Sequence, residues 1–267
     1  STNPRMRQAP QMLDERLAFT EMLHEARDTA PEGSAYRRRI QKIIGEMVPL
    51  EQIRKERKRI AERGDPRKDN PVAVGHDVAD DKELKTYHLR NLKTGEEPDV
   101  DTRFTVAWDE KKNELVFNIR CEEPDMENMI VTDTVWMGDS VAVLLEPPNH
   151  SYYQLELNPD GVLFDADRYG RRLNKKWKSM ARVSTEKGED FWTAEVRIPV
   201  MPLDKGKDDP NHYVVGPKPS KEKPWYFNVG RVRMRAAKGE LDRTAYAFSP
   251  TGGNYHVLEK FAALIIE

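Results

Sequence analysis

The chain has 267 residues, of which 37% are hydrophobic and 34% are charged. Its 44 basic and 46 acidic residues give a formal net charge of -2, which excludes a strongly basic protein built to bind nucleic acid. No apolar run approaches the ~20 residues of a membrane-spanning helix. We therefore expect neither nucleic acid nor a membrane as a partner. The length allows one large or two modest domains with a substantial core.

Apolar residues recur with helical spacing through the first 65 residues. A first stripe ends before Pro31 and Gly33. Ser34 is a suitable N-cap for a second helix, which Pro49 is expected to kink. We expect residues 1–65 to form an α-helical hairpin. Two helices alone bury little apolar surface, so they should pack on another domain or chain.

Residues 66–85 are rich in glycine, proline, aspartate and lysine. This composition is typical of a linker, or of a long irregular loop that leads into the next domain. The hydrophobic pattern differs on its two sides, which places a domain boundary in this segment.

From about Asp101 onward the hydrophobic period is two, as in half-buried strands. Turn residues separate these segments and no helical pattern alternates with them, which favours antiparallel strands over a parallel α/β sheet. We predict a mainly β, antiparallel, jelly-roll-like β-sandwich over residues 86–267. The predicted strands cover residues 102–108, 115–121, 140–145, 152–158, 162–166, 181–184, 191–198, 226–232, 244–248 and 261–266.

Motifs of common enzymes are missing from the sequence. It has no Gly-rich phosphate loop, nucleophile elbow, metalloprotease helix or Cys/His zinc spacing, which favours a protein that is not an enzyme. A hydrolase remains an alternative, because two carboxylates facing each other across a pocket need no local motif. The single cysteine, Cys121, lies in a predicted strand and is expected to be a buried, inert thiol.

Two aromatic residues lie beside strands and not within them. Trp136 precedes an alternating strand, and Tyr255 follows the polar, Gly-rich run 251–254. An aromatic ring at the rim of a β-sandwich can stack on the C–H face of a pyranose. The alternative is that Trp136 closes one end of the core.

The segment 121–128 is acidic. Carboxylates and carbonyls on a loop can hold calcium, but the segment lacks the dense ligand spacing of an EF-hand. A solvated loop is the simpler interpretation and a structural calcium ion is the alternative. No other cofactor is expected.

Residues 77–267 resemble the family 9 carbohydrate-binding modules, because several short motifs occur in the family's order. The matching segments are the strand ending in Trp108-Asp109, the strand 115–119, the Glu123-Pro124 step, the segment from Trp136 to Val141, the hairpin with Tyr153 and Asn158, the strand from Trp192 to Pro199, the strand from Trp225 to Arg231, and the closing strand 261–266.

The resemblance implies a non-catalytic module that holds a polysaccharide or glycan by aromatic stacking. In the sugar-binding members of the family two aromatic residues clamp the terminal sugar, and by position these correspond to Trp136 and Tyr255. The resemblance also implies hydrogen bonds to the sugar from Asp139, Tyr153 and Asn254. It also implies a bacterial, secreted protein, extracellular or periplasmic, in which this chain is the C-terminal part of a larger glycoside-hydrolase-like polypeptide. Residues 1–65 are then the helical tail of a preceding domain. The catalytic domain of that polypeptide is then a partner.

The polar residues around the clamp depart from the family pattern. Ala142 stands where characterised binders have a glutamate, Glu156 where a sugar-binding member has an arginine, and Gly252 where an asparagine is usual. The alternative function is therefore a structural or interaction module with a degenerate sugar site, packed on a missing catalytic domain. An exposed apolar stripe along Ile40, Ile43 and Met47 would favour it.

Overall fold

A computed structural model divides the chain into two compact units, Ser1–Asp69 and Asn70–Glu267. The structure describes residues 10–46, 49–51, 53–55, 58, 67, 69–80, 82–148, 150–169, 172–202, 211–237 and 240–267.

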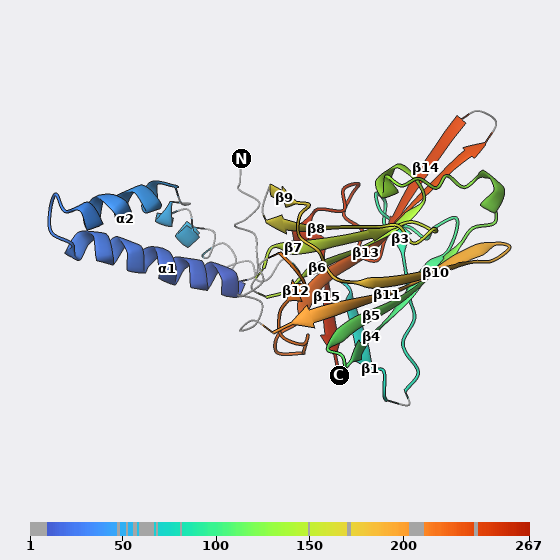
Figure 1. Ribbon diagram of the computed structural model, residues 1–267, viewed down its shortest axis with the longest axis horizontal. Helices are drawn as coiled ribbons and strands as arrows, with labels where there is room; N and C mark the ends of the chain where they lie inside the picture. Colours follow the sequence, from blue (N-terminus) through green and yellow to red (C-terminus); the bar gives the residue numbers. More distant parts are fainter. Residues whose placement is uncertain are drawn as a thin grey trace. The chain divides into compact units, whose positions relative to one another are not determined.

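The first unit is a helical hairpin, as predicted. Helices α1 (Pro10–Thr29) and α2 (Ala35–Glu46) lie side by side (Figure 1). The Ser34 hydroxyl accepts a hydrogen bond from the Arg37 amide at 3.1 Å, which confirms the N-cap. Beyond Pro49, residues 50, 51, 53–55 and 58 are helical. Within the described part of the chain, no helix is long and apolar enough to cross a membrane.

The apolar stripe expected on the second helix is only partly exposed. Ile40 is buried and Ile43 is 39% exposed. Met47 lies outside the described residues.

The second unit is built from fifteen strands among its described residues, joined in places by short 3-10 turns. The strands are β1 (Val72–Asp77), β2 (Tyr87–His88), β3 (Arg90–Asn91), β4 (Thr102–Asp109), β5 (Glu114–Glu122), β6 (Ser140–Glu146), β7 (Tyr152–Leu157), β8 (Leu163–Tyr169), β9 (Arg172–Asn174), β10 (Arg182–Lys187), β11 (Phe191–Met201), β12 (Val214–Val215), β13 (Trp225–Ala237), β14 (Glu240–Ala247) and β15 (Ala262–Ile266).

The strands form an antiparallel β-sandwich of the predicted jelly-roll-like class. One face has the order β10-β11-β5-β4, and the other has the order β15-β13-β6-β7-β8-β9 with β14 added to β13 (Figure 1). Strand β1 pairs in parallel with both β4 and β15 and so joins the two faces.

The core lies between the two faces and is rich in aromatic rings. Phe104 and Phe117 from one face contact Phe227 from the other, with ring centroids 6.0 to 6.1 Å apart. Cys121 belongs to the same core, and burial raises the pKa of its thiol to about 12. The thiol is thus buried and protonated at neutral pH, as the sequence predicts.

Strand β1 falls within residues 66–85, which we expected to form a linker or irregular loop. Gly75 explains the difference, because a Cβ there would lie 2.6 Å from the Val106 carbonyl oxygen. The glycine lets β1 run close to β4, and the Tyr87 hydroxyl binds the Val74 amide at 2.7 Å. The residue type that suggests a flexible loop here permits close packing of two backbones.

Candidate functional site

A cavity of about 350 Å³ lies on the face of the β13-β6-β7-β8 sheet that points away from the core. Strand alternation fixes this side: Val141 and Val143 of β6 point into the core, so Ala142 and Leu144 point to the cavity. The described lining residues are Trp136, Ser140, Ala142, Leu144, Gln154, Glu156, Phe164, Arg168, Leu173, Lys175, Gly230, Val232, Arg243, Tyr255 and His256.

Trp136 lines the cavity and is 43% exposed. It belongs to a short 3-10 turn, Val135–Met137, which buried Val135 anchors. Its ring meets Phe164 edge to face at 5.0 Å, and the Lys175 ammonium lies 5.9 Å from the ring centre. An exposed, supported indole next to a cavity can stack on a ligand ring without losing core contacts.

Tyr255 lines the same cavity but is more firmly held. Its hydroxyl donates to the carbonyl oxygens of Arg231 at 2.6 Å and Tyr246 at 3.0 Å. Burial raises the pKa of Tyr255, so the hydroxyl remains protonated. The two aromatics that the resemblance implies are therefore brought to one cavity.

A chain of hydrogen bonds crosses the sheet beneath the cavity. Arg168 Nε donates to Gln154 Oε1 at 2.7 Å, and Gln154 Nε2 donates to Glu156 Oε2 at 2.9 Å. The Ser140 hydroxyl donates to Glu156 Oε1 at 3.0 Å. Burial raises the pKa of Glu156, although these hydrogen bonds and the charges of Arg168 and Arg243 oppose the shift. Both carboxyl oxygens of Glu156 are thus engaged within the protein.

His256 completes the polar part of the lining. Its Nδ1 lies 2.9 Å from the hydroxyl of Tyr152. Desolvation of the ring, together with the positive charge of Arg168, lowers the pKa of His256 to about 4, although the residue as a whole is exposed. The imidazole is therefore neutral at pH 7 and can offer a nitrogen to a ligand.

The other three residues implied by the resemblance lie outside the described lining. Tyr153 is buried in the core and stacks on Trp177, with ring centres 4.7 Å apart. Asn254 is exposed, and its side-chain oxygen accepts the amide of His256 at 2.9 Å.

Asp139 is fully buried and anchors the segment that carries Trp136. Its carboxylate accepts hydrogen bonds from the Trp192 indole at 3.2 Å and from Arg231 at 3.1 and 3.2 Å. Desolvation raises the pKa of Asp139, and the charge of Arg231 opposes the shift. The Trp136-to-Asp139 segment thus directs its aromatic residue to the cavity and its carboxylate to the interior.

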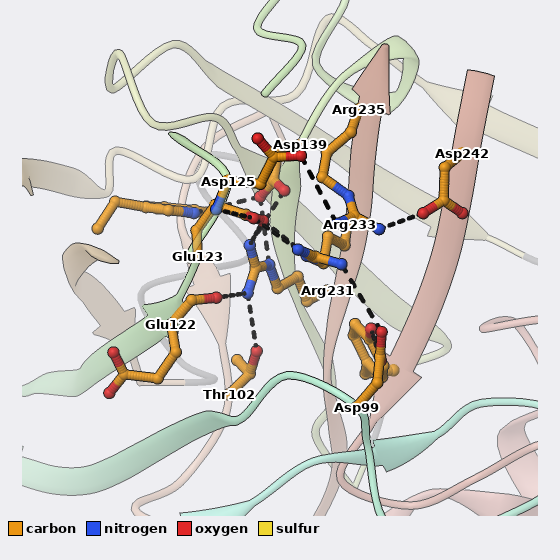
Figure 2. A network of polar contacts seen from close by, with 12 residues as sticks. Asp99, Thr102, Glu122, Glu123, Asp125, Asp139, Arg231, Arg233, Arg235 and Asp242 are labelled. Atoms are coloured by element: carbon orange, nitrogen blue, oxygen red, sulfur yellow. Dashed lines mark hydrogen bonds and ion pairs between the residues drawn. The ribbon is translucent and has the colours of Figure 1, made fainter. Parts of the chain in front are cut away.

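Arg231 belongs to a buried network of ionic groups on the core side of β13 (Figure 2). The Glu123 carboxylate accepts hydrogen bonds from Arg231 at 3.1 Å and from Arg233 at 2.6 and 2.7 Å. Burial acts to raise the pKa of Glu123, but the hydrogen bonds and charges of the two arginines outweigh it and leave the pKa lowered. The predicted acidic loop 121–128 therefore turns its first glutamates toward arginines.

No group of three or more histidine, cysteine or acidic side chains that could hold a metal ion occurs among the residues the structure describes. The calcium ion considered for the acidic loop stays a prediction.

Sequence reasoning missed most of the polar lining. Glu156 stands out in the sequence only as a departure from the family pattern, Gln154 only as part of the hairpin motif with Tyr153, and Arg168 belongs to no motif. The available signal was alternation: Tyr153 and Leu155 point into the core, so Gln154 and Glu156 must point the other way.

Comparisons with known proteins place the fold. A scan against protein families finds no match, and no curated protein matches the chain. Among solved structures, a "putative carbohydrate-binding protein" from Bacteroides uniformis is similar, with a TM-score of 0.54, 15% identity, and coverage of 74% of this chain and 99% of that one. A family 9 carbohydrate-binding module from Caldicellulosiruptor kristjanssonii, solved with cellotriose, gives a TM-score of 0.48 and 14% identity. The match covers 73% of this chain and 94% of that one.

Proposed function

We propose that the β-sandwich unit is a non-catalytic carbohydrate-binding module. A sugar ring stacks on Trp136, and the hydroxyl groups of the sugar are bound in the cavity shared with Tyr255. The observation that carries this proposal is the pairing of an exposed, supported indole with a polar cavity about 350 Å³ in volume. Cavities of this size accept small ligands, and a stacked ring contributes about 1 kcal/mol beyond its buried area.

The polar lining suits a ligand rich in hydroxyl groups. His256, Arg168 and Arg243 carry hydrogen-bonding atoms in the lining. Trp136 and Phe164 supply apolar surface beside them. This mixture fits a saccharide, which carries polar edges and apolar faces. The fold neighbour from Bacteroides uniformis, named for carbohydrate binding, agrees with this proposal.

The helical unit supports a second part of the proposal, an accessory role beside a catalytic domain. Phe19, Met22 and Tyr36 are each more than half exposed. Apolar side chains in such positions suit packing on a further domain. We infer a glycoside hydrolase of the same polypeptide as this partner, acting on polysaccharide outside the cytoplasm.

The binding proposal is tested with the purified chain on a glycan and polysaccharide array, with calcium and with chelator, followed by titration calorimetry on each hit. We expect binding in the millimolar to micromolar range for one sugar end. Trp136→Ala should abolish it with little change in Tm, because the indole is partly exposed. Leu241→Ala is the matched control, since Leu241 is 65% exposed and outside the described lining.

Three results would count against the proposal. Unchanged binding in Trp136→Ala would remove the stacking site. Silence across the array by a folded protein would favour the structural module instead. A large fall in Tm in Trp136→Ala would mean that the indole belongs to the core.

A further inference from the structure

The described lining of the cavity carries an excess of positive charge. Arg168, Lys175 and Arg243 are cationic, Glu156 is the one acidic residue among them, and His256 is neutral at pH 7. The described lining therefore has a formal charge of +2, whereas the whole chain has -2. The excess is local to this surface.

The single carboxylate is already satisfied within the protein. Each oxygen of Glu156 accepts a hydrogen bond, from Ser140 and from Gln154. Glu156 is also 6% exposed, so it presents little surface to a ligand. The side chain therefore orients its neighbours more than it balances the positive charges around the cavity.

The cations come from different elements around the lining. Arg168 lies on β8 and Arg243 on β14, with β7, β6 and β13 between these two strands in the sheet. Both arginines line the cavity, and their positive charges act to lower the pKa of Glu156 in the same lining. Lys175 adds an ammonium group 5.9 Å from the centre of the Trp136 ring.

The guanidinium groups have donors to spare. Arg168 uses its Nε on Gln154. Among the described residues, the terminal nitrogens of Arg168 and the whole guanidinium of Arg243 make no hydrogen bond to the protein. Guanidinium groups bind carboxylate and sulfate through paired, charge-assisted hydrogen bonds. A neutral sugar would leave these donors without an anionic partner.

We propose that the cavity selects an anionic saccharide, one whose terminal residue carries a carboxylate or a sulfate ester. The sugar ring stacks on Trp136, and its anionic group lies within reach of Arg168 and Arg243. This inference rests on the proposed carbohydrate-binding function and narrows it to one class of sugar.

The test compares matched oligosaccharides by titration calorimetry at two salt concentrations. The anionic probes are uronate oligosaccharides (galacturonate, glucuronate and mannuronate) and sulfated galactose oligosaccharides. The neutral probes are the methyl esters of the same uronates and the unsulfated galactose oligosaccharides. A methyl ester keeps the sugar ring and removes its charge, so it isolates the anionic contact.

We expect binding either to the uronate oligosaccharides or to the sulfated ones. The set that binds decides between a carboxylate and a sulfate ester as the anionic group. Removing the charge from the sugar should weaken binding about tenfold or more. Arg168→Gln or Arg243→Gln should have a similar effect and should reduce the dependence of binding on salt. Lys221→Gln, which removes an exposed charge outside the described lining, should bind like the wild type.

The outcomes separate the two proposals. Tightest binding to a neutral probe, lost in Trp136→Ala, would overturn the anionic selection and keep the carbohydrate-binding function. Binding of anionic probes that neither Trp136→Ala nor the arginine variants alter would place the charge contact elsewhere and overturn both. Absence of binding to every probe would overturn the anionic selection, whereas the carbohydrate-binding function is overturned only if the full array is silent as well.

Discussion

The ring of Tyr255 lies against the backbone of Gly230 so closely that a Cβ at position 230 would lie 2.2 Å from Tyr255 Cε1. Gly230 is in the middle of β13, where a larger residue would ordinarily favour the strand. The glycine provides the space in which the tyrosine closes one side of the cavity. The position of the Tyr255 ring in its loop therefore depends on a glycine at position 230 of the sheet.

Gly230→Ala should displace the Tyr255 ring. We expect it to lower the free energy of unfolding by about 1–3 kcal/mol, the usual cost of overpacking, and to weaken ligand binding. Denaturant unfolding and titration of the array ligand measure the two effects. Gly45→Ala is the control, because nothing lies within 4 Å of a Cβ there and the site is helical. Unfolding of Gly230→Ala at wild-type denaturant concentrations would contradict the account.

Tyr255→Phe isolates the buried hydroxyl from the ring. The variant leaves the carbonyl oxygens of Arg231 and Tyr246 without this donor, which should cost about 0.5–1.5 kcal/mol in unfolding free energy. The ring itself remains, so binding should weaken less than in Trp136→Ala. A loss of binding as complete as in Trp136→Ala, in a folded protein, would instead assign the hydroxyl a direct contact with the ligand.

The sequence predicts the sandwich well because its strands bury one face and expose the other. That periodicity determined the fold class and ten of the strands, but not β1, where Gly75 serves close packing. Trp136 and Tyr255 could be singled out because each follows or precedes a strand in a polar segment.

The polar residues of the site were harder to predict because their partners are distant in sequence. Asp139 looks like a loop residue free to bind a ligand, but Arg231, which lies 92 positions later, holds it in the core. Tyr153 looks like a rim aromatic, but its place in the alternation of β7 directs it inward. Alternation shows which residues of one strand point outward, but the register of β6, β7 and β13 is needed to show which of them lie side by side on the outer face.

Arg231 links the two aromatic sides of the cavity. Its guanidinium binds Asp139, three residues after Trp136, and its carbonyl oxygen accepts the hydroxyl of Tyr255. We therefore expect the buried ionic network to influence ligand binding without touching the ligand.

Glu123→Gln tests the stability of this network. Removing the charge of Glu123 leaves Arg231 with the buried carboxylate of Asp139 and Arg233 with the largely exposed carboxylate of Asp99. The loss of a buried charge partner commonly costs about 3–5 kcal/mol. Chemical denaturation measures the loss. Glu222→Gln is the control, because Glu222 is an exposed residue outside the network. Equal unfolding free energies for the two variants would contradict a stabilising role.

Asp139→Asn tests the link to the cavity. The variant keeps the shape of the side chain and loses its charge, so the segment carrying Trp136 should be held less firmly. We expect weaker ligand binding together with a lower Tm, and a smaller loss of binding in Glu123→Gln, because Glu123 does not contact the Trp136 segment directly. Wild-type affinity in a folded Asp139→Asn protein would show that Trp136 is positioned without Asp139.

His256 should make stability depend on pH in a defined window. Its pKa is lowered from 6.5 to about 4 by burial of the ring and by Arg168, so the unfolded chain binds a proton between these values that the folded protein does not. Stability should therefore fall as the pH is lowered from about 6.5 to about 4, and His256 should contribute nothing above 6.5. In His256→Gln this part of the pH dependence should disappear, so Tm measured from pH 7 to pH 4 should fall less than in the wild type. A difference in Tm between the two proteins that stays constant across this range would mean that His256 does not titrate differently in the folded and unfolded states.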